Sequence, residues 1–198
     1  MNWLTARGAA AAVAVGVATI YGFGWRGMTL LLAFFISSSL LTAAAGGGEK
    51  SRGGGPRNAR QVVANGGVAA LAALAGNWAW FAGAIAAANA DTWATEIGSH
   101  SRTPPRLITT GRPVPAGTDG GMTVLGTAAG IAGAGFVAAI AYILGQRRAP
   151  AIAVAGVLGM IVDSLLGATV QGTIRSIDNN AVNLAATLTG AVCAGLMA

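Results

Sequence analysis

The stretch RQVVANGGVAALAALAGNWAWFAGAIAAANADTWATEIG, residues 60–98, decides the fold of this chain. Its two halves, 60–76 and 78–96, are almost entirely apolar, and Gly76-Asn77 between them is a turn signal. Each half approaches the ~20 mostly apolar residues that a membrane span requires. We therefore expect a tight hairpin of two membrane helices, with carboxylates near the end of the second helix.

The whole chain has the composition of a membrane protein. Of its 198 residues, 54% are apolar and 9% are charged, and the mean hydropathy is +0.64. Soluble domains carry roughly 25% charged residues, so this chain lacks the charge that a water-exposed surface needs. The 31 glycines allow close helix packing in lipid. Cys193 is the single cysteine, which excludes an intrachain disulfide.

Hydrophobic runs predict an all-α, polytopic integral membrane bundle, with about six to seven transmembrane helices in one domain, residues 1–198. The runs are approximately 5–24, 27–46, 60–76, 78–96, 122–145, 150–171 and 180–197. Polar loops are expected at about 47–59 and 97–121. The second loop has four prolines and five glycines, so we expect irregular structure there. Pro56 is expected to lie in the first turn of the third helix.

The positions of basic residues predict the orientation in the membrane. With the N-terminus inside, nine Lys and Arg residues lie on the cytoplasmic side and three lie outside. Both long loops, and with them the active site, are then cytoplasmic in the plasma membrane of a prokaryote. The net charge of +6 lies between apolar runs, which favours membrane lipids or an anionic substrate and no nucleic acid. A cleaved export signal at the N-terminus is the weaker alternative, because further spans follow.

Carboxylates inside apolar runs are costly in lipid and indicate function. Asp91 and Glu96 lie in the fourth run, but they point about 140° apart on an unbroken helix. They cannot both serve one point unless the helix breaks there or one of them packs sideways, and the alternative is that one of them pairs with a loop arginine. Asp163 shares a helix face with Ser164 and Gln171 in the sixth run. Its alternative role is a helix–helix hydrogen bond.

Basic residues near helix starts offer sites for phosphates. Arg57 and Asn65 lie on one face at the start of the third run, where free N–H groups and the positive dipole end attract anions. Lys50 adds charge, although these basic residues could serve only to set topology. The glycine-rich stretch TTGRPVPAGTDGGMT, residues 109–123, can present successive N–H groups to a phosphate. In DNNAVN, residues 178–183, Asp178 or Asn179 is expected to cap a helix, and the remaining asparagines exceed that need.

Several known motifs do not match this chain. GGGEKS has Glu49 where a P-loop requires glycine, and no strand precedes it. There is no dinucleotide-binding fingerprint and no zinc-ligand spacing, and His100 in a polar loop is expected to be solvated. Carboxylates suit Mg²⁺ and basic groups suit phosphates, so their gathering at one membrane face predicts phosphoryl transfer to an amphiphilic substrate.

Five longer motifs resemble a known family. NGGVAA, ADTWATEIG, PRLITTGRPVPAGTDGGMTVLG, DSLLGATVQ and DNNAVN are similar to integral membrane proteins catalogued as a domain of unknown function, a family that includes the plastid phytyl-phosphate kinase of tocopherol synthesis. The resemblance covers roughly residues 27–195. It implies phosphorylation of an isoprenoid monophosphate to the diphosphate by a nucleoside triphosphate, CTP favoured, with Mg²⁺. By position it implies functional roles for Asn65, Asp91, Thr92, Glu96, Thr110, Gly117, Thr118, Gly120, Gly121, Asp163, Gln171, Asp178, Asn179, Asn180 and Asn183.

The complete expectation is a membrane-embedded prenyl-phosphate kinase. Asp91, Asp163 and Glu96 form the catalytic set, and Asp91 and Asp163 hold Mg²⁺. The expected nucleotide- and phosphate-binding set is Lys50, Arg57, Asn65, Thr92, Thr110, Arg112, Gly117, Thr118, Gly120, Gly121, Ser164, Gln171, Asp178, Asn179, Asn180 and Asn183. Three alternatives stay open: a nucleotidyltransferase that forms a CDP-lipid, an ion- or proton-coupled transporter, and an assembly subunit. Formation of a homodimer is also left open.

Overall fold

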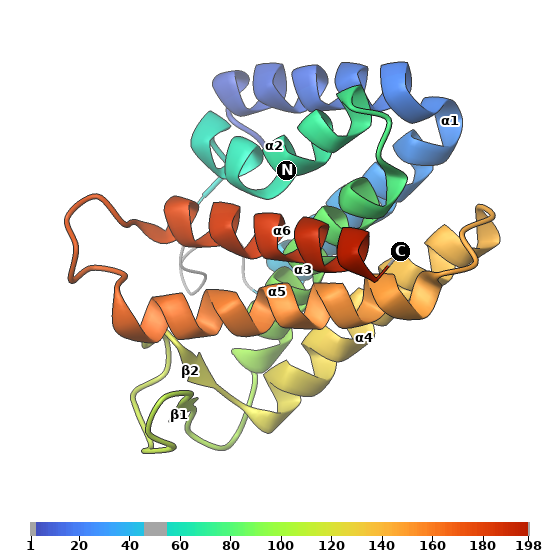
Figure 1. Cartoon of the computed structure of the whole chain (residues 1–198). Helices are drawn as coiled ribbons and strands as arrows, with labels where there is room; N and C mark the ends of the chain where they lie inside the picture. Colours follow the sequence, from blue (N-terminus) through green and yellow to red (C-terminus); the bar gives the residue numbers. More distant parts are fainter. Residues whose placement is uncertain (1–2, 46–54, 198) are drawn as a thin grey trace.

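The computed structural model describes residues 3–45 and 55–197. Within these residues the chain forms six helices and one short pair of strands, drawn in Figure 1. In chain order they are α1 (Ala6–Ala44), α2 (Ala59–Leu74), α3 (Trp78–Gly98), β1 (Arg106–Leu107), β2 (Gly121–Met122), α4 (Val124–Ile143), α5 (Ala149–Thr169) and α6 (Asn179–Leu196).

The expected all-α membrane bundle is confirmed. Among the described helices, α1, α4 and α5 are long and apolar enough to cross a membrane. α1 has 39 residues, which at 1.5 Å each would extend to about 58 Å as a straight helix, well beyond the ~30 Å hydrocarbon core. Helix α1 is interrupted at Gly24, where φ is 56° and ψ is −143°. The two expected runs 5–24 and 27–46 are therefore two legs that meet at one residue, while the total number of spans stays a prediction.

α3 lies at the centre of the bundle and packs against all five other helices. Glycines make the close approaches. A methyl group placed at Gly190 on α6 would lie 2.5 Å from the carbonyl oxygen of Gly83 on α3, and one at Gly156 on α5 would lie 2.8 Å from Ala86 Cβ. Small residues gain dispersion contacts between backbones in lipid, so these positions fix α5 and α6 beside α3.

The helices run between two ends of the bundle, which we name the polar end and the opposite end. The polar end holds the starts of α1, α2, α4 and α6 and the ends of α3 and α5. Thr5 N donates to Arg57 O (3.1 Å), which joins the starts of α1 and α2. A methyl group at Gly98, where α3 ends, would lie 3.0 Å from Gly126 Cα in the first turn of α4. The loop between α5 and α6 projects from this end, on the left in Figure 1.

The opposite end holds the Gly24 break, the α2–α3 turn and the α4–α5 turn. The turn signal at Gly76-Asn77 is confirmed, since Gly76 has φ of 68° and Asn77 caps α3. Arg148 Nη1 donates to Met197 O (3.5 Å), which brings the C-terminal end of α6 to the α4–α5 turn. This end carries Arg26, Arg147 and Arg148, whereas the five Asp and Glu side chains of the described residues all lie toward the polar end.

Two details of the sequence prediction need correction. Pro56 does not lie in the first turn of α2, because Asn58 is the N-cap and forms a capping box with Gln61. The loop expected to be wholly irregular contains the antiparallel pair β1–β2, in which Leu107 faces Gly121. Most of the expected 47–59 loop, including Lys50, lies outside the described residues.

Candidate functional site

The two candidate metal-binding aspartates lie at one level of adjacent helices. A methyl group at Gly159 on α5 would lie 2.5 Å from Ala87 Cβ on α3 and 2.7 Å from the carbonyl oxygen of Ala186 on α6. Asp91 lies one turn beyond Ala87 and Asp163 one turn beyond Gly159, and both helices run toward the polar end. Since residues four apart share a helix face, each aspartate lies about one turn beyond this contact toward the polar end.

Asp163 accepts a hydrogen bond from α6. With its amide oriented to satisfy its neighbours, Asn183 Nδ2 donates to Asp163 Oδ2 (2.9 Å) and to the carbonyl oxygen of Asn179 (3.3 Å). Asp163 is 8% exposed, so this donor stabilises a buried carboxylate. The helix–helix hydrogen bond that was the alternative for Asp163 is therefore present. Asn183 orients this carboxylate, a role that residue spacing did not suggest.

The glycine-rich loop docks on α5 beside Asp163. Gly120 has φ of 72°, and a methyl group there would lie 2.6 Å from the carbonyl oxygen of Ser164 and 2.7 Å from Ala168 N. A methyl group at Gly167 would lie 3.0 Å from Gly120 N. Only glycine permits this approach, so the structure brings Gly120 against Ser164, which follows Asp163 in the sequence.

The outer part of the same loop lies apart from this contact. Thr110 Oγ1 accepts a hydrogen bond from Arg112 N (3.3 Å), and both residues are exposed. Thr118 Oγ1 donates to Pro115 O (2.8 Å) in a turn that contains Gly117, whose φ is 86°. These residues form the loop's own turns, and their proposed contact with phosphate stays a prediction.

A second polar cluster joins side chains of α1 and α3 to Arg57, which lies just before α2. Thr42 Oγ1 donates to Glu96 Oε1 (2.7 Å), and Arg57 Nη1 donates to Ser39 Oγ (3.0 Å). Burial lowers the pKa of Arg57, and attraction to Glu96 offsets part of that decrease. Glu96, which is 6% exposed, thus interacts with Arg57. Pairing with a loop arginine was the alternative role that the sequence predicted for one of the two carboxylates. The expected catalytic role of Glu96 stays a prediction.

The serines of this cluster were missing from the sequence prediction. Ser37 Oγ and Ser38 Oγ donate to Asn89 Oδ1 (3.2 and 3.3 Å), and Asn89 Nδ2 donates to Gly133 O (2.8 Å). Asn89 is fully buried, so these bonds supply the partners that a buried amide needs. The available signal was the run of three serines, 37–39, within an otherwise apolar segment.

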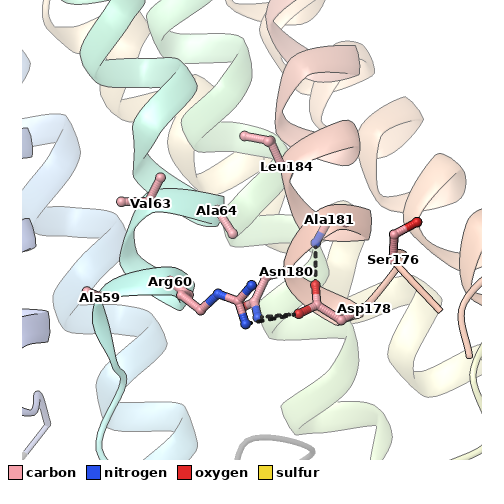
Figure 2. A pocket seen from close by; sticks show the side chains of 9 residues that line it. All are labelled: Ala59, Arg60, Val63, Ala64, Ser176, Asp178, Asn180, Ala181 and Leu184. Atoms are coloured by element: carbon pink, nitrogen blue, oxygen red, sulfur yellow. Dashed lines mark hydrogen bonds and ion pairs between the residues drawn. The ribbon is translucent and has the colours of Figure 1, made fainter.

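A groove opens between α2 and α6, shown in Figure 2. It has a volume of about 410 Å³. At its polar end Arg60 Nη1 lies 3.7 Å from Asp178 Oδ2, and Asn180 Nδ2 donates to the same oxygen (3.3 Å). Asp178 is the N-cap of α6, as one sequence alternative predicted, and the hydrogen bond from Ala181 N lowers its pKa, followed by that from Asn180.

The remaining candidates make local contacts. Thr92 Oγ1 donates to Ala88 O (2.9 Å), and Asn65 Nδ2 donates to Gln61 O (3.0 Å), each within its own helix. Gln171 lies just after α5. Gly121 belongs to β2. These positions neither assemble a phosphate site among themselves nor contradict one.

Comparison with known proteins assigns the chain to a family. The family described as "Integral membrane protein DUF92" matches residues 1–191. This chain belongs to that family. The resemblance drawn from the sequence motifs is therefore confirmed, and so is the assignment as an integral membrane protein.

Relatives of this DUF92 member include membrane proteins of unassigned function and two plant proteins. The chain is 39% identical over 144 residues to "Uncharacterized membrane protein MJ0933" of Methanocaldococcus jannaschii, covering 69% of this chain and 60% of that protein. It is 40% identical over 103 residues to "Protein PGR" of Arabidopsis thaliana (45% and 36%) and 34% identical over 112 residues to "Protein VTE6, chloroplastic" of the same plant (54% and 34%).

The chain spans between about a third and three fifths of the length of these curated relatives. No solved structure matches it.

Proposed function

We propose that this DUF92 member is a membrane-embedded kinase that transfers the terminal phosphoryl group of a nucleoside triphosphate to an isoprenoid monophosphate. The products are the isoprenoid diphosphate and a nucleoside diphosphate. The observation that carries the proposal is the placement of Asp91 and Asp163 at one level of α3 and α5, at the end of the bundle that is rich in arginine. The motif resemblance to the family of the plastid phytyl-phosphate kinase supplies the substrate class.

The charge distribution supports a site for phosphates at the polar end. Of the ten arginines among the described residues, seven lie at the polar end, namely Arg7, Arg57, Arg60, Arg102, Arg106, Arg112 and Arg175. Phosphoryl transfer depends mainly on positioning and charge neutralisation. The same asymmetry favours a cytoplasmic polar end, so the proposed site is cytoplasmic in a prokaryotic plasma membrane.

The residues present fit a magnesium ion. Mg²⁺ in kinase sites takes one or two protein carboxylates and fills its octahedron with water and phosphate oxygens, and Asp91 and Asp163 supply one carboxylate each, one turn beyond the close contact of Ala87 on α3 with Gly159 on α5. Within residues 3–45 and 55–197, no group of three or more His, Cys, Asp or Glu side chains gathers, so the fit depends on this pair. When bound, the ion would neutralise charge on the nucleotide phosphates.

The other residues position these groups. Asn183 holds Asp163 through its 2.9 Å hydrogen bond. Gly120 holds the 117–121 turn against Ser164 and Ala168 of α5, near Asp163 in the sequence, and we propose that backbone N–H groups of this turn meet a phosphate. CTP is the nucleotide we propose, on the basis of the resemblance alone.

Product analysis tests the proposal and its nearest alternative together. Purified protein in nanodiscs is incubated with Mg²⁺, each of the four nucleoside triphosphates and several prenyl monophosphates, with label at the γ- or the α-phosphate. We expect γ-label in a lipid diphosphate. α-Label in the lipid would identify a nucleotidyltransferase, and absence of transfer with every pair would refute both.

A further inference from the structure

The groove between α2 and α6 is polar at one end and apolar along its walls, which matches an amphiphilic ligand. Its polar end carries Arg60, Asp178 and Asn180, while its walls further along the helices are Val63 and Leu184. Figure 2 shows this separation, with the charged side chains at one end of the groove and the aliphatic ones beyond them. Val63 is 51% exposed and Leu184 43% exposed, so the walls belong to the lipid-facing surface of the bundle.

The floor of the groove is closed by direct contact of the two helices. Thr187 Oγ1 donates to the carbonyl oxygen of Ala64 (3.1 Å) at a fully buried position. The small side chains of Ala64 and Ala181 leave the space above this contact open. The groove therefore opens sideways to the bilayer and ends at the Arg60–Asp178 pair.

The groove adjoins the residues of the proposed active site. Asn180 lines its polar end, and Asn183, three residues later on α6, donates to Asp163. Residues three apart are neighbours on a helix surface. A group held at Asn180 thus lies about one helical turn from Asn183, the residue that contacts Asp163.

We propose that this groove seats the isoprenoid monophosphate, which enters sideways from the bilayer between α2 and α6. This inference rests on the proposed function for the substrate class. The hydrocarbon chain lies along Val63 and Leu184, and the phosphate meets Arg60 and Asn180. Arg60 is 80% exposed and its pair with Asp178 spans 3.7 Å. Exposed pairs of this kind are weak, so a phosphate can take the place of the carboxylate beside Arg60.

The size of the groove agrees with such an occupant. Small-molecule pockets usually measure about 300–1,000 Å³ and combine apolar walls with a few placed polar groups. At about 410 Å³ the groove lies within this range. Because it is open to the bilayer, the distal part of a long chain can remain in lipid.

Matched tryptophan substitutions test the seat. Leu184→Trp fills the groove, whereas Leu188→Trp changes the next turn of the same helix outside it, at a residue that is 47% exposed. Full-length protein in nanodiscs is photolabelled with a tritiated farnesyl monophosphate that carries a diazirine on its chain. We expect label on the peptides that contain Val63 and Leu184, and at least about tenfold weaker labelling after Leu184→Trp, the scale for losing apolar pocket contacts. Leu188→Trp should label normally.

Arginine substitutions test the headgroup contact. Arg60→Gln should weaken competition by unlabelled farnesyl monophosphate but leave competition by farnesol unchanged. Arg147→Gln, in the exposed α4–α5 turn at the opposite end, is the charge control and should alter neither competitor.

The outcomes separate this inference from the proposed function. Normal labelling of Leu184→Trp, or label confined to other helices, refutes binding of the isoprenoid monophosphate in this groove even if γ-phosphate transfer is observed. Competition by phosphatidylglycerol as effective as that by farnesyl monophosphate also overturns it, because the groove then holds ordinary bilayer lipid. Specific labelling of the groove without any transfer supports the seat and refutes the kinase.

Discussion

The contact between the glycine-rich loop and α5 gives a prediction with a built-in control. Gly120 and Gly111 lie in the same loop with nearly equal backbone angles, φ of 72° and 68°. A methyl group at Gly120 meets the Ser164 carbonyl oxygen at 2.6 Å, whereas one at Gly111 has no atom within 4 Å. Comparison of Gly120→Ala with Gly111→Ala therefore isolates the contact with α5.

The magnitude follows from two contributions. Placing alanine in the left-handed region costs roughly 1–2 kcal/mol in both variants, and this cost cancels in the comparison. Forcing an extra methyl group into a packed contact costs typically about 1–3 kcal/mol. We expect Gly120→Ala to shift the equilibrium between docked and undocked loop by that amount, which corresponds to about 5–150-fold.

Hydrogen exchange in nanodiscs measures this shift. Ile108 N donates to Gly120 O (3.0 Å), so exchange of the Ile108 amide reports on the docked loop. It should be about 5–150-fold faster in Gly120→Ala than in Gly111→Ala, and transfer activity should decrease in the same order. Equal exchange rates in the two variants would show that the loop does not depend on its contact with α5.

Three further predictions concern the polar end. Asn183→Ala removes the donor to buried Asp163 and should destabilise the protein by about 1–3 kcal/mol and lower turnover, as measured by thermal unfolding and by γ-label transfer. Thr42→Val removes the 2.7 Å bond to Glu96 and should cost about 0.6–2 kcal/mol, measured by detergent-induced unfolding; no change would contradict a structural role for this bond. Asp178 has a lowered pKa, so its contribution to stability is present above its unfolded pKa of about 3.9 and decreases as pH falls through the folded value. The acid dependence of the melting temperature should therefore weaken in Asp178→Asn, and an unaltered profile would refute this.

Local chain chemistry predicted most of the fold. Apolar runs, the turn at Gly76-Asn77 and capping at Asp178 each depend on neighbouring residues, and the structure confirms them. Helix α2 begins at Ala59 rather than at Pro56, because the Asn58 capping box prevailed over the preference of Pro56 for a first turn. The short β1–β2 pair was missed because two-residue strands leave no periodic pattern.

The site was less predictable, because its contacts depend on helix packing. Angular positions on a single helix predicted different surroundings for Glu96 and Asp91, and the structure places Glu96 near Arg57 and Thr42. The hydrogen bond from Asn183 to Asp163 joins residues twenty positions apart, and no spacing rule on one helix could specify it.

The central claim is that Asp91 and Asp163 together hold the metal–nucleotide complex, and charge removal tests it most directly. Turnover of prenyl monophosphate is measured for Asp91→Asn and Asp163→Asn, with the folded fraction determined in parallel. We predict that each change lowers turnover by at least about 10²-fold, the scale for losing one preorganised electrostatic group, while the protein stays folded because a carboxylate costly to bury has been removed. Normal turnover in either variant, or loss of any folded fraction, would contradict the account.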